Sequence, residues 1–144
     1  TDSLGWPYSV FDIREEYCNQ KRYPNAERNF CSSVDDFLKS ENEDSLARFS
    51  DILLLSHDWS VDEEMLVGLL QLCRAGSRPR IGAIGSKKKW SAFEKKAIES
   101  GVEKWLIDSV RCPIGLDIGA DTPEEIAIAV CAEVLSLERK NGAT

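Results

Sequence analysis

Four clusters of polar, basic and glycine residues follow apolar segments that the sequence predicts to be buried strands. They are Asp12 with Arg14, His57 with Asp58 and Asp62, the run that holds Gly82, Gly85, Ser86 and Lys87, and the loop that holds Gly115, Asp117 and Gly119. Such residues bind small molecules through hydrogen bonds to hydroxyl groups and through charge or backbone N–H groups to phosphates. Because ligands gather at the carboxyl ends of parallel strands, we expect the four clusters to form one ligand-binding rim.

Asp12 ends a predicted strand, at the position where dinucleotide-binding folds place the acid that bonds ribose hydroxyls. The phosphate-binding fingerprint G-x-G-x-x-G precedes such an acid by about 20 residues. Only eleven residues precede Asp12. We therefore expect the first strand and the glycine-rich loop of such a fold to be missing, and a solvated turn acid is the alternative interpretation of Asp12.

His57 is the single histidine, which limits the chemistry. A metal-dependent phosphohydrolase needs further histidines, and a Ser-His-Asp hydrolase needs a G-x-S-x-G turn, which is absent. The five cysteines are never spaced as C-x-x-C, so neither structural zinc nor a disulfide framework is predicted. We predict no catalytic and no metal-binding residue, and His57 either orients a ligand or is a hydrogen-bonded residue at a strand end.

Lys87, Lys88 and Lys89 begin a predicted helix, where the positive end of the helix dipole disfavours each ammonium group by up to about 1 kcal/mol. An anion should therefore lie nearby. The glycines before them would let backbone N–H groups approach a phosphate, and Ser86 would either cap the helix or bond that phosphate. A solvated lysine-rich helix face is the alternative.

The loop at residues 111–125 leads into a strongly predicted helix. Thr122 suits the N-cap, Pro123 the first helical position, and Glu125 completes a capping box, ahead of the apolar-periodic residues 126–137. Residues Gly115 to Asp117 are expected to close over the ligand, and the alternative for Asp117, whose negative charge does not suit an anion, is that it accepts hydrogen bonds from pterin or ribose donors. Cys112, just before a proline in this loop, is a candidate for ligand contact, with a structural thiol as the alternative.

Strand and helix patterns alternate along the chain, which predicts an α/β fold with a parallel sheet. Strands are expected at residues 8–13, 28–31, 51–56 and 80–84, with a short edge strand at 105–107. Helices are expected after Ser33, after Ser60 in a capping box with Glu63 and closed by Gly76, at 87–100 closed by Gly101, and after Thr122. With 144 residues, of which 42% are hydrophobic, the whole chain 1–144 is predicted to be one domain.

The formal charge of −7 argues against a surface built for nucleic acid or anionic membrane. No apolar stretch approaches the roughly 20 residues that span a bilayer, and no signal peptide is evident. We expect a cytoplasmic protein with neither nucleic-acid nor membrane partners.

Three segments resemble the C-terminal domain of the XdhC/CoxI family: SHDWSVDEEML (56–66), IGAIGSKKK (81–89) and PIGLDIGA (113–120), with Asp12 and Arg14 similar to the end of that family's second strand. The resemblance implies a Rossmann-like three-layer fold with a mostly parallel sheet. It also implies an accessory protein that binds the molybdenum cofactor, molybdopterin, and delivers it to the apoenzyme of a molybdenum hydroxylase such as xanthine or carbon monoxide dehydrogenase, without turning over a substrate. Lysines stand where the family often has arginines, and these supply charge but no planar fork.

Two other functions stay open: an oxidoreductase-like module that binds NAD(P), which the missing fingerprint disfavours, and a structural subunit that has lost its ligand. The loss of a central strand would leave unpaired backbone edges. We therefore expect a homo-oligomer, or a partner chain that supplies the missing N-terminal segment.

Overall fold

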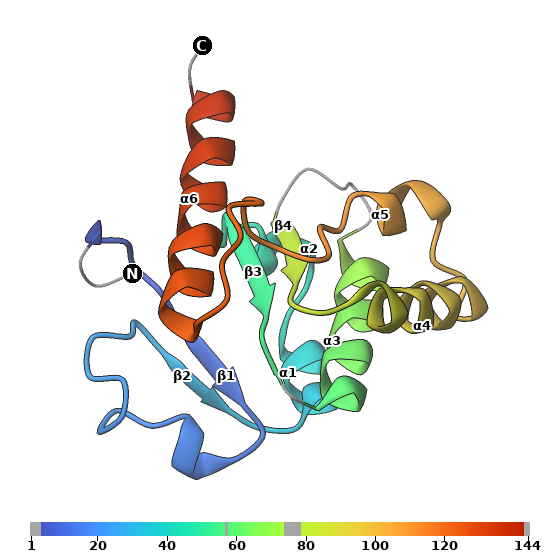
Figure 1. Cartoon of the computed structure of the whole chain (residues 1–144). Coiled ribbons are helices and arrows are strands. Elements are labelled where there is room, and N and C mark those ends of the chain that lie inside the picture. Colours follow the sequence, from blue (N-terminus) through green and yellow to red (C-terminus); the bar gives the residue numbers. More distant parts are fainter. Residues whose placement is uncertain (1–3, 57, 74–78, 143–144) are drawn as a thin grey trace. The chain divides into compact units, whose positions relative to one another are not determined.

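The computed structural model describes residues 4–56, 58–73 and 79–142 (Figure 1). It divides into two compact units, residues 1–42 and residues 43–144. The prediction of one domain over 1–144 is not decided by this division, and each unit is described by itself. Among the described residues, no helix is long and apolar enough to cross a membrane.

The first unit is a two-stranded parallel sheet with one short helix. It contains β1 (Val10–Asp12), the 3-10 turn η2 (Glu15–Tyr17), β2 (Asn29–Cys31) and α1 (Val34–Ser40). Phe11 pairs with Phe30 across the sheet, and both rings contact Phe37 of α1, with ring centroids 5.2 and 5.3 Å apart. The Ser33 hydroxyl caps α1 by accepting a hydrogen bond from a backbone N–H, as predicted. This aromatic cluster makes the small core of the unit.

The second unit holds the remaining elements. They are α2 (Glu43–Leu46), β3 (Asp51–Leu54), α3 (Trp59–Leu72), β4 (Arg80–Ala83), α4 (Lys87–Glu99), α5 (Lys104–Asp108) and α6 (Pro123–Gly142). Strands β3 and β4 are parallel, and Arg111 extends the sheet through a bridge to Gly82. Helices α3 and α4 pack together, and Leu66, Leu69 and Phe93 are fully buried. This is the larger core, and it positions the ends of β3 and β4.

The α/β class and the four main strands are confirmed, but the predicted strand at residues 105–107 is wrong. Those residues lie in α5, where Lys104 bonds Asp108 one turn later at 3.0 Å while Leu106 and Ile107 are buried on the inner face. An apolar run of three residues cannot distinguish a strand from one turn of buried helix.

The structure describes two parallel strand pairs, β1–β2 in the first unit and β3–β4 in the second, and a single sheet that contains all four strands stays a prediction. In the described part of the chain, each strand pairs with one other strand, and β4 has the bridge to Arg111 in addition.

Two predicted helix boundaries differ in outcome. The capping box before α6 is confirmed, since Thr122 Oγ1 accepts from the Glu125 N–H and Glu125 Oε1 accepts from the Thr122 N–H, both at 3.2 Å. The box of Ser60 with Glu63 is wrong, because α3 begins at Trp59 and Asp58 is its N-cap. An aspartate two residues earlier competes for the N-cap position as well as a serine does.

Of the two glycines predicted to end helices, Gly101 closes α4 with φ of +83°, as predicted. Gly76 lies outside the described residues.

Candidate functional site

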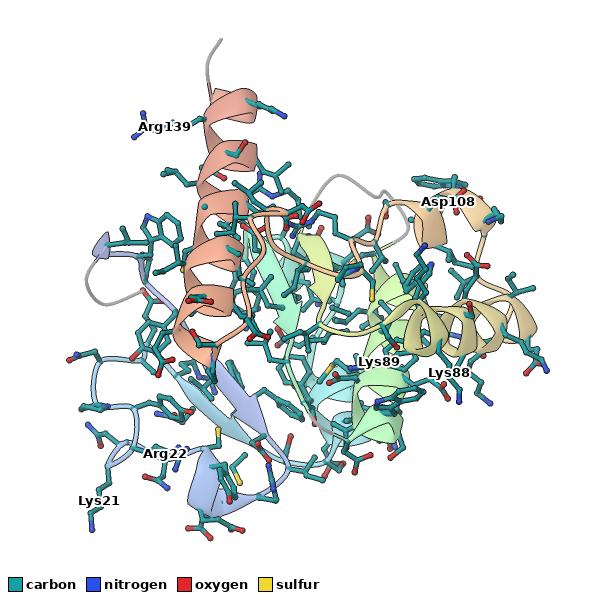
Figure 2. All side chains as sticks on the ribbon, viewed as in Figure 1. Lys21, Arg22, Lys88, Lys89, Asp108 and Arg139 are labelled. Atoms are coloured by element: carbon teal, nitrogen blue, oxygen red, sulfur yellow. The ribbon has the colours of Figure 1, made fainter. Side chains whose placement is uncertain are left out.

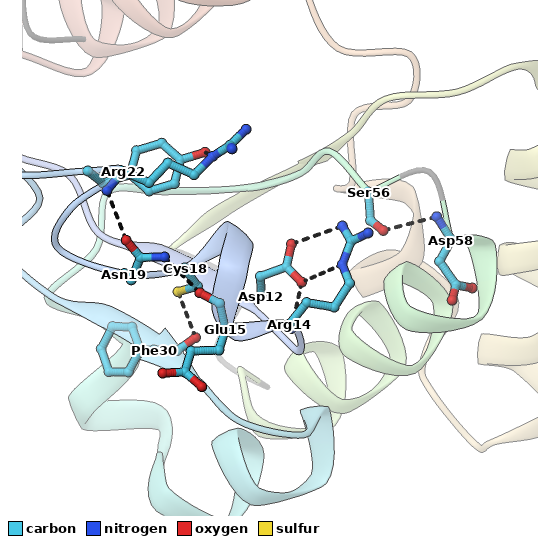
Figure 3. A network of polar contacts seen from close by, with 10 residues as sticks. Asp12, Arg14, Glu15, Cys18, Asn19, Arg22, Phe30, Ser56 and Asp58 are labelled. Carbon is cyan, nitrogen blue, oxygen red and sulfur yellow. Dashed lines mark hydrogen bonds and ion pairs between the residues drawn. The ribbon is translucent and has the colours of Figure 1, made fainter.

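Asp12 and Arg14 form a local ion pair at the end of β1. Asp12 Oδ1 accepts from the Arg14 backbone N–H at 2.9 Å and from Arg14 Nε at 3.2 Å, and Oδ2 accepts from Nη2 at 3.4 Å (Figure 3). Burial raises the pKa of the Asp12 carboxyl, but the Arg14 bonds outweigh it and leave this pKa below its usual value. Asp12 is thus ionised at neutral pH and can accept hydrogen bonds from a ligand hydroxyl on its remaining lone pairs.

Ser56 and Asp58 build the turn between β3 and α3. The Ser56 hydroxyl accepts from the Asp58 backbone N–H at 3.0 Å (Figure 3), and Asp58 Oδ1 accepts from the Ser60 N–H at 3.0 Å and from its hydroxyl at 2.6 Å. Asp58 is the N-cap of α3, and it is exposed to solvent. His57, the third residue predicted at this turn, lies outside the described residues.

A buried ion pair joins the helices that leave the carboxyl ends of β3 and β4. Lys89 Nζ donates to Asp62 Oδ2 at 3.1 Å and to the Ile84 carbonyl at 2.8 Å, and both side chains are 4% exposed. Burial raises the pKa of the Asp62 carboxyl, and the Lys89 ammonium and the Ser56 backbone N–H partly offset this rise. The anion that the lysine run required at Lys89 is therefore a carboxylate of the protein itself.

Two of the glycines predicted to approach a phosphate also have a packing role. A Cβ at Gly82 would lie 2.3 Å from Ile114 Cγ2, and a Cβ at Gly85 would lie 2.4 Å from Lys89 Cδ. Gly85 has φ of +152°, which glycine adopts without strain. The absence of a side chain at Gly82 therefore lets the loop at residues 113–120 pack on β4. Its absence at Gly85 lets the aliphatic part of the Lys89 side chain pass inward.

Lys87 and Lys88 remain exposed in the first turn of α4, unlike Lys89. In Figure 2, Lys88 extends away from α4, whereas Lys89 lies on the side that contacts α3. The Ser86 hydroxyl caps the helix by accepting from the Lys89 N–H at 3.3 Å, which confirms one of its two predicted roles. Two ammonium groups thus stand at a positive helix end without a carboxylate partner among the described residues, an arrangement that favours an anion.

The loop at residues 113–120 borders a hollow of about 550 Å³ together with Ile126 and Ala129 of α6. The Leu116 N–H donates to the Ala129 carbonyl at 3.1 Å, and Gly115, with φ of +102°, lies against Ala129. The side chains that line it are apolar except for the exposed Asp117, and polar groups supply about half of its exposed surface. The hollow can hold an apolar or aromatic group with hydrogen-bond donors facing Asp117.

Cys112, at the start of this loop, is half-buried. Burial raises the pKa of its thiol, although the Lys89 charge opposes the rise. The raised pKa favours the protonated thiol at neutral pH, and this suits a structural residue. Among the described residues, no cluster of histidine, cysteine and carboxylate side chains could hold a metal ion.

Within the second unit, described residues of the three predicted clusters lie on segments that are bonded to the carboxyl ends of β3 and β4. The Ile114 N–H donates to the Ala83 carbonyl at 3.2 Å, which brings the loop to the end of β4, and Lys89 and Asp62 tie that end to Ser56. Asp12 and Arg14 lie in the first unit. That all four clusters form one rim stays a prediction.

The sequence interpretation missed two ion-pair systems. The first is Lys89 with Asp62, for which an acid in the first turn of α3 and a basic first turn of α4 were the available signals. The second lies at the opposite edge of the sheet, where Arg80 binds Asp51 at 2.7 Å and Glu138 of α6 at 2.8 Å. Arg111 joins it through contacts with Asp51 and Glu133. An Asp and an Arg that begin neighbouring strands were its only sequence signal.

Comparisons with known proteins identify the family. A family model described as the XdhC Rossmann domain matches residues 1–134. The protein YqeB of Escherichia coli (strain K12) is 31% identical over 139 residues, which are 94% of this chain and 24% of YqeB. A crystal structure described as a xanthine dehydrogenase from Bacillus halodurans matches with a TM-score of 0.71 and 28% identity, over 92% of this chain and 35% of that one. The chain thus spans about a quarter to a third of these relatives. With the parallel strands, the match confirms the Rossmann-like α/β fold, and the chain belongs to the XdhC Rossmann-domain family.

Proposed function

We propose that this protein is an accessory factor for molybdenum hydroxylases of the xanthine or carbon monoxide dehydrogenase type. It binds the molybdenum cofactor in the cytoplasm and delivers it to the apoenzyme without turning over a substrate. The family match supports this role, as does the likeness to a structure described as a xanthine dehydrogenase.

One observation carries the proposal: the end of β4 leads into the capped start of α4 with its two exposed lysines, and the loop that borders the hollow is bonded to the same strand end through the Ile114 N–H and the Ala83 carbonyl. Lys87 and Lys88 offer positive charge, and the backbone N–H groups of the first turn of α4 offer hydrogen-bond donors. The hollow at residues 113–120 offers apolar surface and the Asp117 carboxylate. A phosphate-bearing pterin needs these three features, namely charge for the phosphate, apolar contact for the ring, and an acceptor for the ring N–H groups.

The residues present therefore fit the cofactor. Lys87, Lys88 and Ser86 would hold its phosphate, and Asp58 and Asp117 would accept from its amino and ring N–H groups. When bound, the cofactor supplies the molybdenum centre that the recipient enzyme uses. The chain's own residues bind it, orient it and limit its contact with water.

A binding assay tests the proposal. Molybdopterin cofactor released from a purified molybdenum hydroxylase is titrated against the wild-type chain and the double variant Lys87→Glu/Lys88→Glu. We expect binding to weaken by about 10-fold or more, because two attractive charges become repulsive; 10-fold corresponds to about 1.4 kcal/mol. Lys95→Glu/Lys96→Glu makes the same charge change on exposed positions of α4 away from its first turn and should bind as the wild type does.

Equal loss in both double variants would show that only net charge matters and would contradict a site at the start of α4. Tighter binding of NAD(P)H than of the cofactor would favour an oxidoreductase-like module, and binding of neither would favour a structural subunit. Restored activity of a cofactor-free hydroxylase after incubation with the loaded chain tests delivery.

A further inference from the structure

The first unit holds two cysteines on neighbouring segments of the backbone. Cys18 follows the turn η2 and is 3% exposed, whereas Cys31 ends β2 and is exposed. Cys18 Sγ donates to the Phe30 carbonyl at 3.2 Å (Figure 3) and to the Val10 carbonyl at 3.4 Å. One acceptor of the Cys18 thiol is thus the carbonyl of the residue that precedes Cys31.

This hydrogen bond limits the distance between the two cysteines. A planar trans peptide holds a carbonyl oxygen about 2.8 Å from the Cα atom of the next residue. Cys18 Sγ therefore lies within about 6 Å of the Cys31 Cα atom. The Cα atoms of two bridged cysteines are usually about 4.4–6.8 Å apart, so a bond between these two sulfur atoms needs only local movement.

The two thiols share one face of the sheet formed by β1 and β2. Successive side chains of a strand point to opposite faces, and the Phe30 ring contacts Phe37 of α1. Cys31 therefore points to the other face, as does Asp12, its cross-strand partner. Burial raises the pKa of the Cys18 thiol, the Asp12 backbone N–H opposes this rise, and the charges of Cys31 and Asp12 add to it. Both charges thus lie near Cys18 Sγ, on the face away from α1.

An exposed thiol beside a second thiol is the arrangement of redox-sensing cysteines, in which the second thiol resolves the oxidised first one. We propose that a hydroperoxide, such as hydrogen peroxide, oxidises Cys31 and that Cys18 then forms a reversible disulfide with it. Reversible disulfides of this kind act as redox sensors in reducing compartments.

The reaction has two steps. The Cys31 thiolate attacks one oxygen of hydrogen peroxide, the O–O bond breaks, and Cys31 sulfenic acid and hydroxide form; the hydroxide takes up the proton that the thiol released. The Cys18 sulfur then attacks the Cys31 sulfur, the S–O bond breaks, and the hydroxyl group leaves as water with the Cys18 proton. The two thiols lose two electrons, and hydrogen peroxide is reduced to two molecules of water.

The other three cysteines, all in the second unit, are less accessible than Cys31. Cys73 is buried, and Cys112 and Cys131 are half-buried. Burial raises the pKa of the Cys73 and Cys112 thiols, which lowers the fraction of thiolate that an oxidant attacks. We therefore expect oxidation to begin at Cys31.

The disulfide would change the end of β1, and this part of the inference rests on the proposed function. It removes the thiol donor from the Val10 and Phe30 carbonyls and ties the turn after β1 to β2. Asp12, the predicted hydroxyl-binding residue, lies opposite Cys31, and its partner Arg14 lies in that turn. Oxidation should therefore weaken cofactor binding.

Peptide mapping of the whole chain tests the disulfide without any cofactor. The reduced chain is treated with hydrogen peroxide, its remaining thiols are alkylated, and it is digested with trypsin in the absence of reductant. Trypsin cleaves after lysine and arginine, so Cys18 falls in the peptide 15–21 and Cys31 in the peptide 29–39. Mass spectrometry should find these two peptides joined in the monomeric chain, and dithiothreitol should separate them.

Three variants separate the roles of the cysteines. Cys18→Ser keeps a donor for the same two carbonyls and removes the resolving thiol, so dimedone should trap a sulfenic acid at Cys31. Cys31→Ser should leave Cys18 as a free thiol after the same treatment, because Cys18 is buried. Cys131→Ala is the matched control in the second unit and should form the same cross-link as the wild type.

Three results would overturn the inference. They are oxidation of Cys31 to sulfinic acid in the wild type without a cross-link, a cross-link that forms only in urea, and a cross-link that joins two chains. Equal cofactor affinity of the reduced and oxidised chains would overturn the effect on binding alone. A chain that forms the disulfide but binds no cofactor in either state would support the disulfide and contradict the proposed function, so the two failures are distinguishable.

Discussion

At the scale of single residues, the lysine run shows how adjacent identical side chains take different roles. Lys89 is held inside by Asp62 and the Ile84 carbonyl, whereas Lys87 and Lys88 stay exposed. Helical geometry causes the split, because successive residues are about 100° apart around the axis and only one of the three can face α3. The charge available to a ligand is therefore two lysines, not three.

Removal of Lys89 should destabilise the fold strongly. Lys89→Met leaves the Asp62 carboxylate buried without its partner, and we expect a loss of about 3–5 kcal/mol in the free energy of unfolding. Lys88→Met is the matched control and should change this free energy by less than about 0.5 kcal/mol. The double variant Asp62→Leu/Lys89→Met removes both charges and should regain most of the loss. Urea denaturation measures all three, and similar losses in Lys89→Met and Lys88→Met would contradict a structural role for the buried pair.

Glu125 gives a pH dependence of known sign. Hydrogen bonds from the Asp121 and Thr122 backbone N–H groups hold its pKa below the usual 4.5. A carboxyl whose pKa is lower in the folded state stabilises the fold above its unfolded pKa, and this contribution is lost as the pH falls through the folded pKa. NMR titration should find the lowered pKa, and the thermal midpoint of Glu125→Gln should fall less steeply below pH 4.5 than that of the wild type. If the thermal midpoints of the wild type and Glu125→Gln fell equally steeply with pH, the capping box of Thr122 with Glu125 would not be a source of the protein's acid sensitivity.

At the scale of elements, the start of α3 separates two capping schemes. The structure makes Asp58 the N-cap, so Asp58→Ala should cost about 1 kcal/mol of unfolding free energy. Ser60 lies inside the first turn, and Ser60→Ala should cost less because it removes only a hydroxyl bond to Asp58. Chemical denaturation compares the two variants, and a larger loss in Ser60→Ala would favour the capping box of Ser60 with Glu63.

Elements with a long pattern or a distinctive end were predictable from sequence. The strands that contain Ile52 and Ile81 and the helix after Thr122 carry clear apolar runs or caps. The prediction of a strand at residues 105–107 was wrong because a buried helical turn and a short strand can have the same composition. The roles of Gly82 and Gly85 in packing were not predictable, because they depend on Ile114 and Lys89, which come from other elements.

At the scale of the whole molecule, the sequence predicted the class and the family but not the division into two compact units. The order of strands and helices is local information, and it fixes an α/β class. Which strands pair depends on every neighbour being present, and β1 and β3 each show one neighbour among the described residues. In the same way, residue types predict a ligand-binding edge, whereas the different roles of Lys89 and of the exposed Lys87 and Lys88 depend on contacts with other elements.

The start of α3 has an optical consequence. Trp59, 44% exposed, is the first residue of that helix, and the half-buried Trp90 lies in the first turn of α4. Two indole fluorophores therefore flank the carboxyl edge of β3 and β4. A ligand that absorbs in the near ultraviolet should quench their emission on arrival, and the shifts of the exposed and half-buried indoles should differ. Intrinsic tryptophan fluorescence should therefore report the binding of such a ligand without an added label.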